Sequence, residues 1–128
     1  MMNYHMPILD EMVVECDTRR QAIIDTPHIL QSENRPDAVF CVNDDCAVGV
    51  LHAAQILGVK IPEELSICGF SDAPICRVKM PMLTTVQQHG FEIGKRAMTR
   101  LLKRLERAES IPQTEMVPTD LIVRETTK

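Results

Sequence analysis

Short apolar runs alternate along this chain with stretches in which apolar residues recur every three or four positions. The runs predict strands and the recurring positions predict helices. Strands are predicted at 12–16, 38–42 and 65–70, with extended segments at 83–88 and 116–123. Helices are predicted at 19–33, from Asn43 to a C-cap at Gly58, and at 91–108. Pro27 predicts a kink or the start of a second helix, and the continuous run 38–42 is typical of a strand buried on both faces.

Strands that alternate with helices through short loops favour βαβ units around a parallel sheet. The predicted fold class is therefore α/β. In such sheets, ligands bind in the crevice at the carboxyl ends of the strands. Polar residues follow three of the predicted strands, at Asp17-Thr18, Asn43-Asp44-Asp45 and Ser71-Asp72. We expect these side chains to have no basic partner nearby in the sequence.

The strand-end residues support three interpretations. As helix caps, they would stabilise each helix by about 1 kcal/mol and need no ligand. As a rim of carboxylates, amides and hydroxyls, they would suit a ligand with many hydroxyl groups. As an acid pair, Asp44 and Asp45 would begin a metal-dependent phosphoryl-transfer pocket of the receiver type. The third interpretation is the weakest, because no lysine closes a later strand.

The helix predicted at 91–108 has an apolar stripe and a basic side. The stripe consists of Phe91, Gly94, Ala97, Met98, Leu101, Leu102 and Leu105. The basic side consists of Arg96, Arg100, Lys103, Arg104 and Arg107. Glu92 and Glu106 interrupt the positive charge, so a solvated amphipathic face explains it better than a DNA or membrane patch.

Charge and composition restrict the kinds of partner that this chain is expected to bind. Lys and Arg number 14 against 18 Asp and Glu, a formal net charge of −4. A dedicated nucleic-acid-binding domain usually carries the opposite balance, so we expect this chain itself not to bind DNA. No apolar run approaches the roughly 20 residues that span a bilayer. We expect a cytoplasmic protein without a membrane partner.

The cysteines, histidines and short motifs of the sequence show no catalytic or metal-binding pattern. The five cysteines form no CxxC pair and are odd in number, which favours reduced thiols. His5, His28, His52 and His89 have no metal-ligand spacing. Neither a glycine-rich phosphate loop nor a nucleophile elbow occurs. We therefore expect neither an enzyme nor a bound metal or cofactor.

Four ordered motifs resemble those of the LacI/GalR family of bacterial transcription regulators. Residues 35–49, RPDAVFCVNDDCAVG, resemble the family's PDAIFAANDxxAxG. Residues 58–72, GVKIPEELSICGFSD, resemble its GxxVPExxSVxGFDD. Residues 81–88, PMLTTVQQ, and 121–127, LIVRETT, are similar to its PxLTTVxQ and LxxRxST. The match covers the chain from about Arg35 to its last residues.

The resemblance implies a two-subdomain effector-binding core like that of periplasmic sugar-binding proteins. Its C-terminal subdomain is a three-layer α/β structure with a parallel sheet. In the family, a sugar or purine-type metabolite binds between the subdomains and changes operator affinity, and a helix-turn-helix domain binds the DNA. This sequence shows no helix-turn-helix, so we expect it to be the C-terminal part of such a core and to reach DNA only through a domain absent from it.

The resemblance also implies site residues. Asn43 matches the family's effector-contacting Asn, and Ser71 stands where the family has the first Asp of GFDD. Asp72, Asp17 and Thr18 complete the expected effector site, although Thr18 replaces a frequent ring-stacking aromatic. The family's effector-binding Arg has no substitute in Met1-Met2-Asn3. These departures argue against a typical hexose as the effector. We still expect the effector to be a sugar or a related metabolite.

The family topology divides the chain. Residues of about 12–86 and 119–128 would form the C-terminal subdomain, and about 87–118 would normally pack on the N-terminal subdomain. Without that subdomain the apolar stripe would be exposed to water, which costs about 25 cal/mol for each Å² of apolar surface. We therefore predict a homodimer in which the two copies of this helix pair or exchange places. Further dimer contacts implied by the resemblance are Ala47, Val48, Leu51, Ile75, Cys76 and Val78.

Overall fold

The computed structural model describes residues 10–78, 80–106 and 111–128. Its strands are β1 (Ala38–Phe40), β2 (Ser66–Phe70), β3 (Thr84–Gln87) and β4 (Asp120–Ile122). Its α-helices are α1 (Arg19–Leu30), α2 (Asp44–Ile56) and α3 (Gly90–Leu105), with 3₁₀ turns η2 (Asp10–Met12) and η3 (Pro74–Arg77). None of these described helices is long and apolar enough to cross a membrane.

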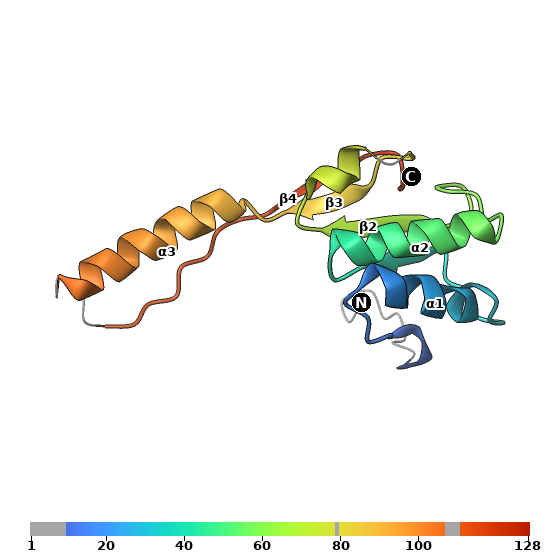
Figure 1. Cartoon of the computed structure of the whole chain (residues 1–128), viewed down its shortest axis with the longest axis horizontal. Coiled ribbons are helices and arrows are strands. Elements are labelled where there is room, and N and C mark those ends of the chain that lie inside the picture. The colour runs from blue at the N-terminus through green and yellow to red at the C-terminus, as the bar shows by residue number, and fades with distance from the viewer. Residues whose placement is uncertain (1–9, 79, 107–110) are drawn as a thin grey trace.

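The strands form one sheet in the order β1-β2-β3-β4 (Figure 1). β1, β2 and β3 are parallel, and β4 runs antiparallel to β3. α2 packs on the sheet, and α1 packs on α2. The predicted α/β class with a mostly parallel sheet is confirmed.

α2 lies at the centre of the core. Asn43 caps its first turn, and Gly58 follows its end with a φ of 73°, the left-handed conformation that glycine adopts readily. Leu51 of this helix is buried with Ile67 of β2 and with Leu83, the residue before β3. Gly49 lets α1 approach closely, because a methyl group there would lie 2.6 Å from the Arg19 carbonyl oxygen.

The strand predicted at 12–16 is wrong. Residues 10–12 form η2, and residues 13–17 join no strand of the described sheet. Val13 is 70% exposed. Strand propensity expresses packing on a pleated surface rather than a backbone preference, and this segment has no such surface beside it in the described part of the chain.

The strand predicted at 38–42 is shorter than expected and is not buried on both faces. β1 ends at Phe40, and Phe40 and Val42 are 65% and 62% exposed. They lie on the sheet face opposite α2, where the Phe40 ring meets Phe70 edge-on with centroids 6.2 Å apart. Among the described elements, no helix covers this face, so the described residues do not show the third layer that the resemblance implies. Pro27 starts no second helix, since α1 continues through it.

α3 extends away from the rest of the molecule, with the segment that leads to β4 running back beside it (Figure 1). The predicted helix is confirmed, although the expected end that includes Arg107 lies outside the described residues. None of its described residues is buried. Arg96 pairs with Glu115 at 2.7 Å, and the Arg100 guanidinium donates to the Gln113 carbonyl oxygen at 2.8 Å. The basic side is therefore partly covered by the returning segment, not simply solvated as expected.

Candidate functional site

The carboxyl ends of β1 and β2 lie at one edge of the sheet. The strands are parallel, and Phe40 is paired with Cys68 in their register. Asn43 comes three residues after Phe40, and Ser71 comes three residues after Cys68. The two candidate residues therefore follow neighbouring strands at the same edge of the sheet. This placement is the one that α/β proteins use for ligands.

Asn43 connects this edge to the start of α1. Its Oδ1 accepts a hydrogen bond from the Cys46 backbone N–H at 2.8 Å, which caps α2. Its Nδ2 donates to the Asp17 carbonyl oxygen at 3.0 Å. Thr18 caps α1 by accepting from the Gln21 N–H at 3.3 Å. The structure thus brings Asp17, Thr18 and Asn43 together, and the cap interpretation holds for Asn43 and Thr18.

The backbone at Ser71 and Asp72 is strained. Their φ angles are 122° and 55°, a region that residues with a Cβ rarely occupy. Such strain persists only where surrounding contacts hold it, and it gathers at ligand sites and switches. Here the Ser71 N–H donates to the Val86 carbonyl oxygen at 2.8 Å, and Gln88 Nε2 donates to Ser71 Oγ at 2.8 Å. Gln88, which lies in the PMLTTVQQ motif, is a further residue at this edge that was not expected from the sequence.

Asp72 is turned toward two arginines. Its side chain is 3% exposed, and Arg124 Nη2 donates to it at 2.6 Å while Arg77 pairs with its other oxygen. Burial alone would raise the pKa of Asp72, but the hydrogen bonds from Arg124 and Arg77 outweigh it and hold the pKa below its usual value. The expectation of no basic partner nearby in the sequence is wrong for Asp72, since Arg77 lies five residues from it, whereas Arg124 lies 52 residues away.

Asp44 and Asp45 point to different partners. The buried Asp44 carboxylate accepts from Thr85 Oγ1 and, at 2.7 Å, from the Ala73 N–H. Asp45 forms an ion pair with Arg19, which lies 26 residues away in the sequence. The described residues contain no group of three His, Cys, Asp or Glu side chains that could hold a metal ion. The arrangement does not favour a receiver-type acid pocket.

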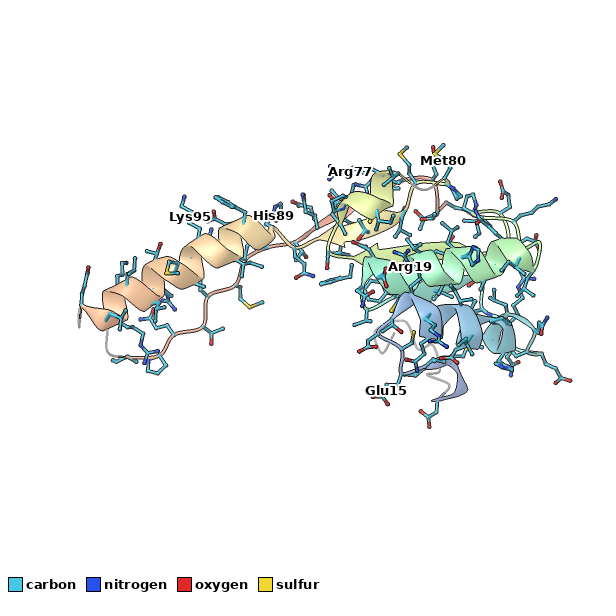
Figure 2. The ribbon with its side chains drawn as sticks, viewed as in Figure 1. Glu15, Arg19, Arg77, Met80, His89 and Lys95 are labelled. Atoms are coloured by element: carbon cyan, nitrogen blue, oxygen red, sulfur yellow. The ribbon has the colours of Figure 1, made fainter. Side chains whose placement is uncertain are left out.

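The junction of β3 and α3 adjoins Ser71. A shallow depression of about 350 Å³ is lined by Ser71, Gln87, His89, Gly90, Phe91 and Glu92. His89 stands at the base of α3 (Figure 2), where its Nε2 lies 2.7 Å from an Asp120 carboxylate oxygen on β4. This contact ties the start of α3 to the sheet. His5 and Met1-Met2-Asn3 lie outside the described residues.

The residues expected at a dimer interface lie in different places. Ala47, Val48, Leu51 and Cys76 are at most 2% exposed and pack in the core of the single chain. Ile75 is partly buried, and Val78 is 73% exposed. Of these six, Val78 therefore offers the largest surface to a second copy.

A family model for the periplasmic binding protein-like domain matches residues 7–127. The chain belongs to the periplasmic binding protein-like domain family. It is 36% identical over 114 residues to the HTH-type transcriptional repressor PurR of Vibrio vulnificus, a match that covers 89% of this chain and 33% of the relative. The periplasmic binding protein-like chain thus spans about a third of the length of that curated relative.

Solved LacI-family regulators share this periplasmic binding protein-like fold. A regulator from Enterococcus faecium with bound ribose matches with a TM-score of 0.77 and 29% identity, over 86% of this chain and 40% of the other. A regulator from Lactobacillus casei with bound sucrose matches with a TM-score of 0.85 and 25% identity, over 99% of this chain and 47% of the other. The LacI-family resemblance is therefore confirmed, and the chain corresponds to the C-terminal part of the effector-binding core. These relatives are transcription regulators, not enzymes.

Proposed function

We propose that this chain is the C-terminal part of the effector-binding core of a LacI-type transcription regulator, with the effector at the edge of the sheet formed by Asn43 and Ser71. One observation carries the proposal: neighbouring parallel strands deliver these two side chains to the same edge, beside a strained backbone turn. Asp17 and Thr18 complete the rim through the Asn43 hydrogen bond. Asp72 acts as a positioning residue, because its carboxylate is bound to arginines.

The effector is a small hydroxyl-bearing metabolite, a sugar or a related compound. Amide and hydroxyl groups at the rim can both donate and accept hydrogen bonds, which suits such a ligand. Two structural neighbours hold ribose and sucrose. In the whole regulator, effector binding would change the affinity of a helix-turn-helix domain for its operator in the cytoplasm. Residues of about 12–86 and 119–128 form the lobe that carries the site.

Ser71→Ala is expected to weaken effector binding by about fivefold, since removal of one hydrogen bond at a binding site changes the free energy by about 1 kcal/mol. The measurement is isothermal titration calorimetry of the chain against ribose, sucrose and purine bases. Ser66→Ala is the matched control, because Ser66 lies at the opposite end of the same strand, β2, and should leave the affinity unchanged. Equal weakening by both variants, or no binding of any of these compounds, would remove the site from this edge.

We also propose that two copies pair through the apolar stripe of α3. Phe91 is 87% exposed and Leu105 is 71% exposed, and Leu101 and Leu102 are each 51% exposed. In larger regulators the segment of about 87–118 would pack on the N-terminal subdomain. A second copy of this chain offers a matching apolar surface, so that the two helices pair or exchange places.

Leu101→Glu is expected to shift the chain from dimer to monomer, because a charge in the centre of the stripe would be buried without a partner. Multi-angle light scattering after size-exclusion chromatography measures the mass. Thr99→Glu adds the same charge outside the stripe and should leave the dimer intact. A wild-type chain that is monomeric at every concentration tested would end the proposal.

A further inference from the structure

Two thiols meet beside the candidate site. Cys16 Sγ lies 3.9 Å from Cys46 Sγ, although 30 residues separate them in the chain. Cys46 lies in the first turn of α2, directly after the cap formed by Asn43. Cys16 comes immediately before Asp17, whose carbonyl oxygen binds the Asn43 side chain. All cysteines of the chain are free thiols in the structure.

The geometry around this pair allows a covalent bond. A disulfide brings the two sulfur atoms to about 2.05 Å, so the thiols must approach by less than 2 Å. Residues 13–17 belong to no helix or strand, and Val13 and Val14 beside Cys16 are exposed. The backbone of this segment can therefore move. Cys46 is fixed in α2, and its Sγ already lies 3.5 Å from the Cys16 carbonyl oxygen.

We propose that Cys16 and Cys46 form a hydroperoxide-sensitive thiol pair that closes to a reversible disulfide. The Cys16 thiolate attacks one oxygen of hydrogen peroxide, the O–O bond breaks, and Cys16 sulfenic acid and hydroxide form. The Cys46 sulfur then attacks the Cys16 sulfur and displaces a second hydroxide. The proton that Cys16 lost to form its thiolate and the proton of the Cys46 thiol neutralise the two hydroxides. In sum, two thiols and one peroxide give one disulfide and two waters: sulfur is oxidised and the peroxide oxygens are reduced.

The order of these steps follows from burial. Cys16 is partly exposed whereas Cys46 is only 3% exposed, so Cys16 is the more accessible of the two to peroxide. Burial raises the pKa of the Cys46 thiol to about 11 and that of the Cys41 thiol to about 12, which slows their direct oxidation because the thiolate is the nucleophile. Cys46 therefore reacts second, after Cys16 has become a sulfenic acid whose hydroxide can leave.

The disulfide would add a covalent bond to the contacts that already join these two parts, among them the Asn43–Asp17 hydrogen bond and the Arg19–Asp45 ion pair. It would fix the segment before α1 against the first turn of α2. Disulfides of intracellular proteins are usually transient and redox-sensing. The pair does not depend on the proposed effector, because it stands on the positions of the two thiols alone.

The test treats the reduced 128-residue chain with hydrogen peroxide, blocks the remaining thiols by alkylation, and maps the digest by mass spectrometry without reductant. We expect a cross-linked peptide pair that contains Cys16 and Cys46, three remaining free thiols of the five, and full reversal by dithiothreitol. The oxidised chain should also melt at a higher temperature than the reduced chain. Alkylated Cys16 and Cys46 after treatment, or Cys16 oxidised without a cross-link, would overturn the proposal.

Cys16→Ser and Cys46→Ser should each abolish the cross-link and the shift in melting temperature. Cys68→Ser is the control, because Cys68 lies in β2 on the sheet face opposite α2 and should leave both unchanged. Far-UV circular dichroism verifies that each variant is folded. A cross-link that joins Cys41 to Cys46, or Cys16 of two chains, would assign the reactivity to another pair and would reject this one.

Discussion

Arg124→Ala is expected to lower the free energy of unfolding by about 3–5 kcal/mol, the range for removing one partner of a buried ion pair. The Arg124 and Asp72 side chains are 11% and 3% exposed, and 2.6 Å separates their paired atoms. Arg124 Nη1 also donates to the Leu83 carbonyl oxygen at 2.7 Å. Without Arg124, the buried Asp72 carboxylate retains only Arg77, and the strained turn after β2 loses its main anchor. Urea unfolding followed by circular dichroism measures the change.

Arg77→Ala provides the matched control. Arg77 binds the other oxygen of Asp72, but its side chain is 61% exposed, so its removal should change the free energy of unfolding by at most about 1 kcal/mol. Equal losses in the two variants would show that burial of the Arg124 pair does not matter. That result would contradict the role given to Arg124.

The pH dependence of the same two proteins tests the charge of Asp72. The pKa of Asp72 is held below its ordinary value of 3.8 in the folded state. A lowered folded pKa contributes stability that is present above the ordinary value and is lost as the pH falls through the folded value. The wild-type advantage over Arg124→Ala should therefore be full above about pH 4 and shrink at lower pH. An advantage that stays constant down to pH 2 would contradict an ionised Asp72 as its source.

The elements that the sequence predicts well are those whose ends carry their own signals. α2 has a capping Asn43 at one end and Gly58 at the other, and its apolar residues recur at helical spacing between them. The run 12–16 has the composition of a strand but no neighbouring strand to pair with in the described part of the chain. Local composition does not show whether a partner strand is present, which is why that prediction is wrong.

Some residues of the candidate site can likewise be predicted from the sequence, and others cannot. Asn43 and Ser71 can be predicted because each follows an apolar strand, and strand ends in a parallel sheet share an edge. The partner of Asp72 cannot be predicted from spacing, since Arg124 lies 52 residues further along the chain. Its only signal in the sequence is its place in the closing LIVRETT motif. Gln88 likewise meets Ser71 only after β3 has been placed beside β2.

Asp44→Ala is expected to lower the free energy of unfolding by about 3 kcal/mol. The Asp44 carboxylate is buried and accepts hydrogen bonds from the Thr85 hydroxyl and the Ala73 N–H. Alanine would leave the buried Thr85 hydroxyl and the partly buried Ala73 N–H without this acceptor, and an unsatisfied buried group costs about 1–3 kcal/mol. Because Thr85 Oγ1 also accepts from the Asp72 N–H at 3.4 Å, the loss should reach the turn at Ser71 and Asp72. Urea unfolding and faster amide exchange at Ser71 measure the two effects.

Asp45→Ala is the matched control, because it removes the neighbouring carboxylate. It tests whether the stability depends on the hydrogen bonds of Asp44 or on any acidic side chain at the start of α2. Asp45 and Arg19 are both about half exposed, so the loss should be at most about 1 kcal/mol, and amide exchange at Ser71 should not change. Asp44 therefore links the first turn of α2 to β3 and to the turn that presents Ser71. If Asp45→Ala were as destabilising as Asp44→Ala, helix capping charge rather than this buried network would hold the edge of the sheet.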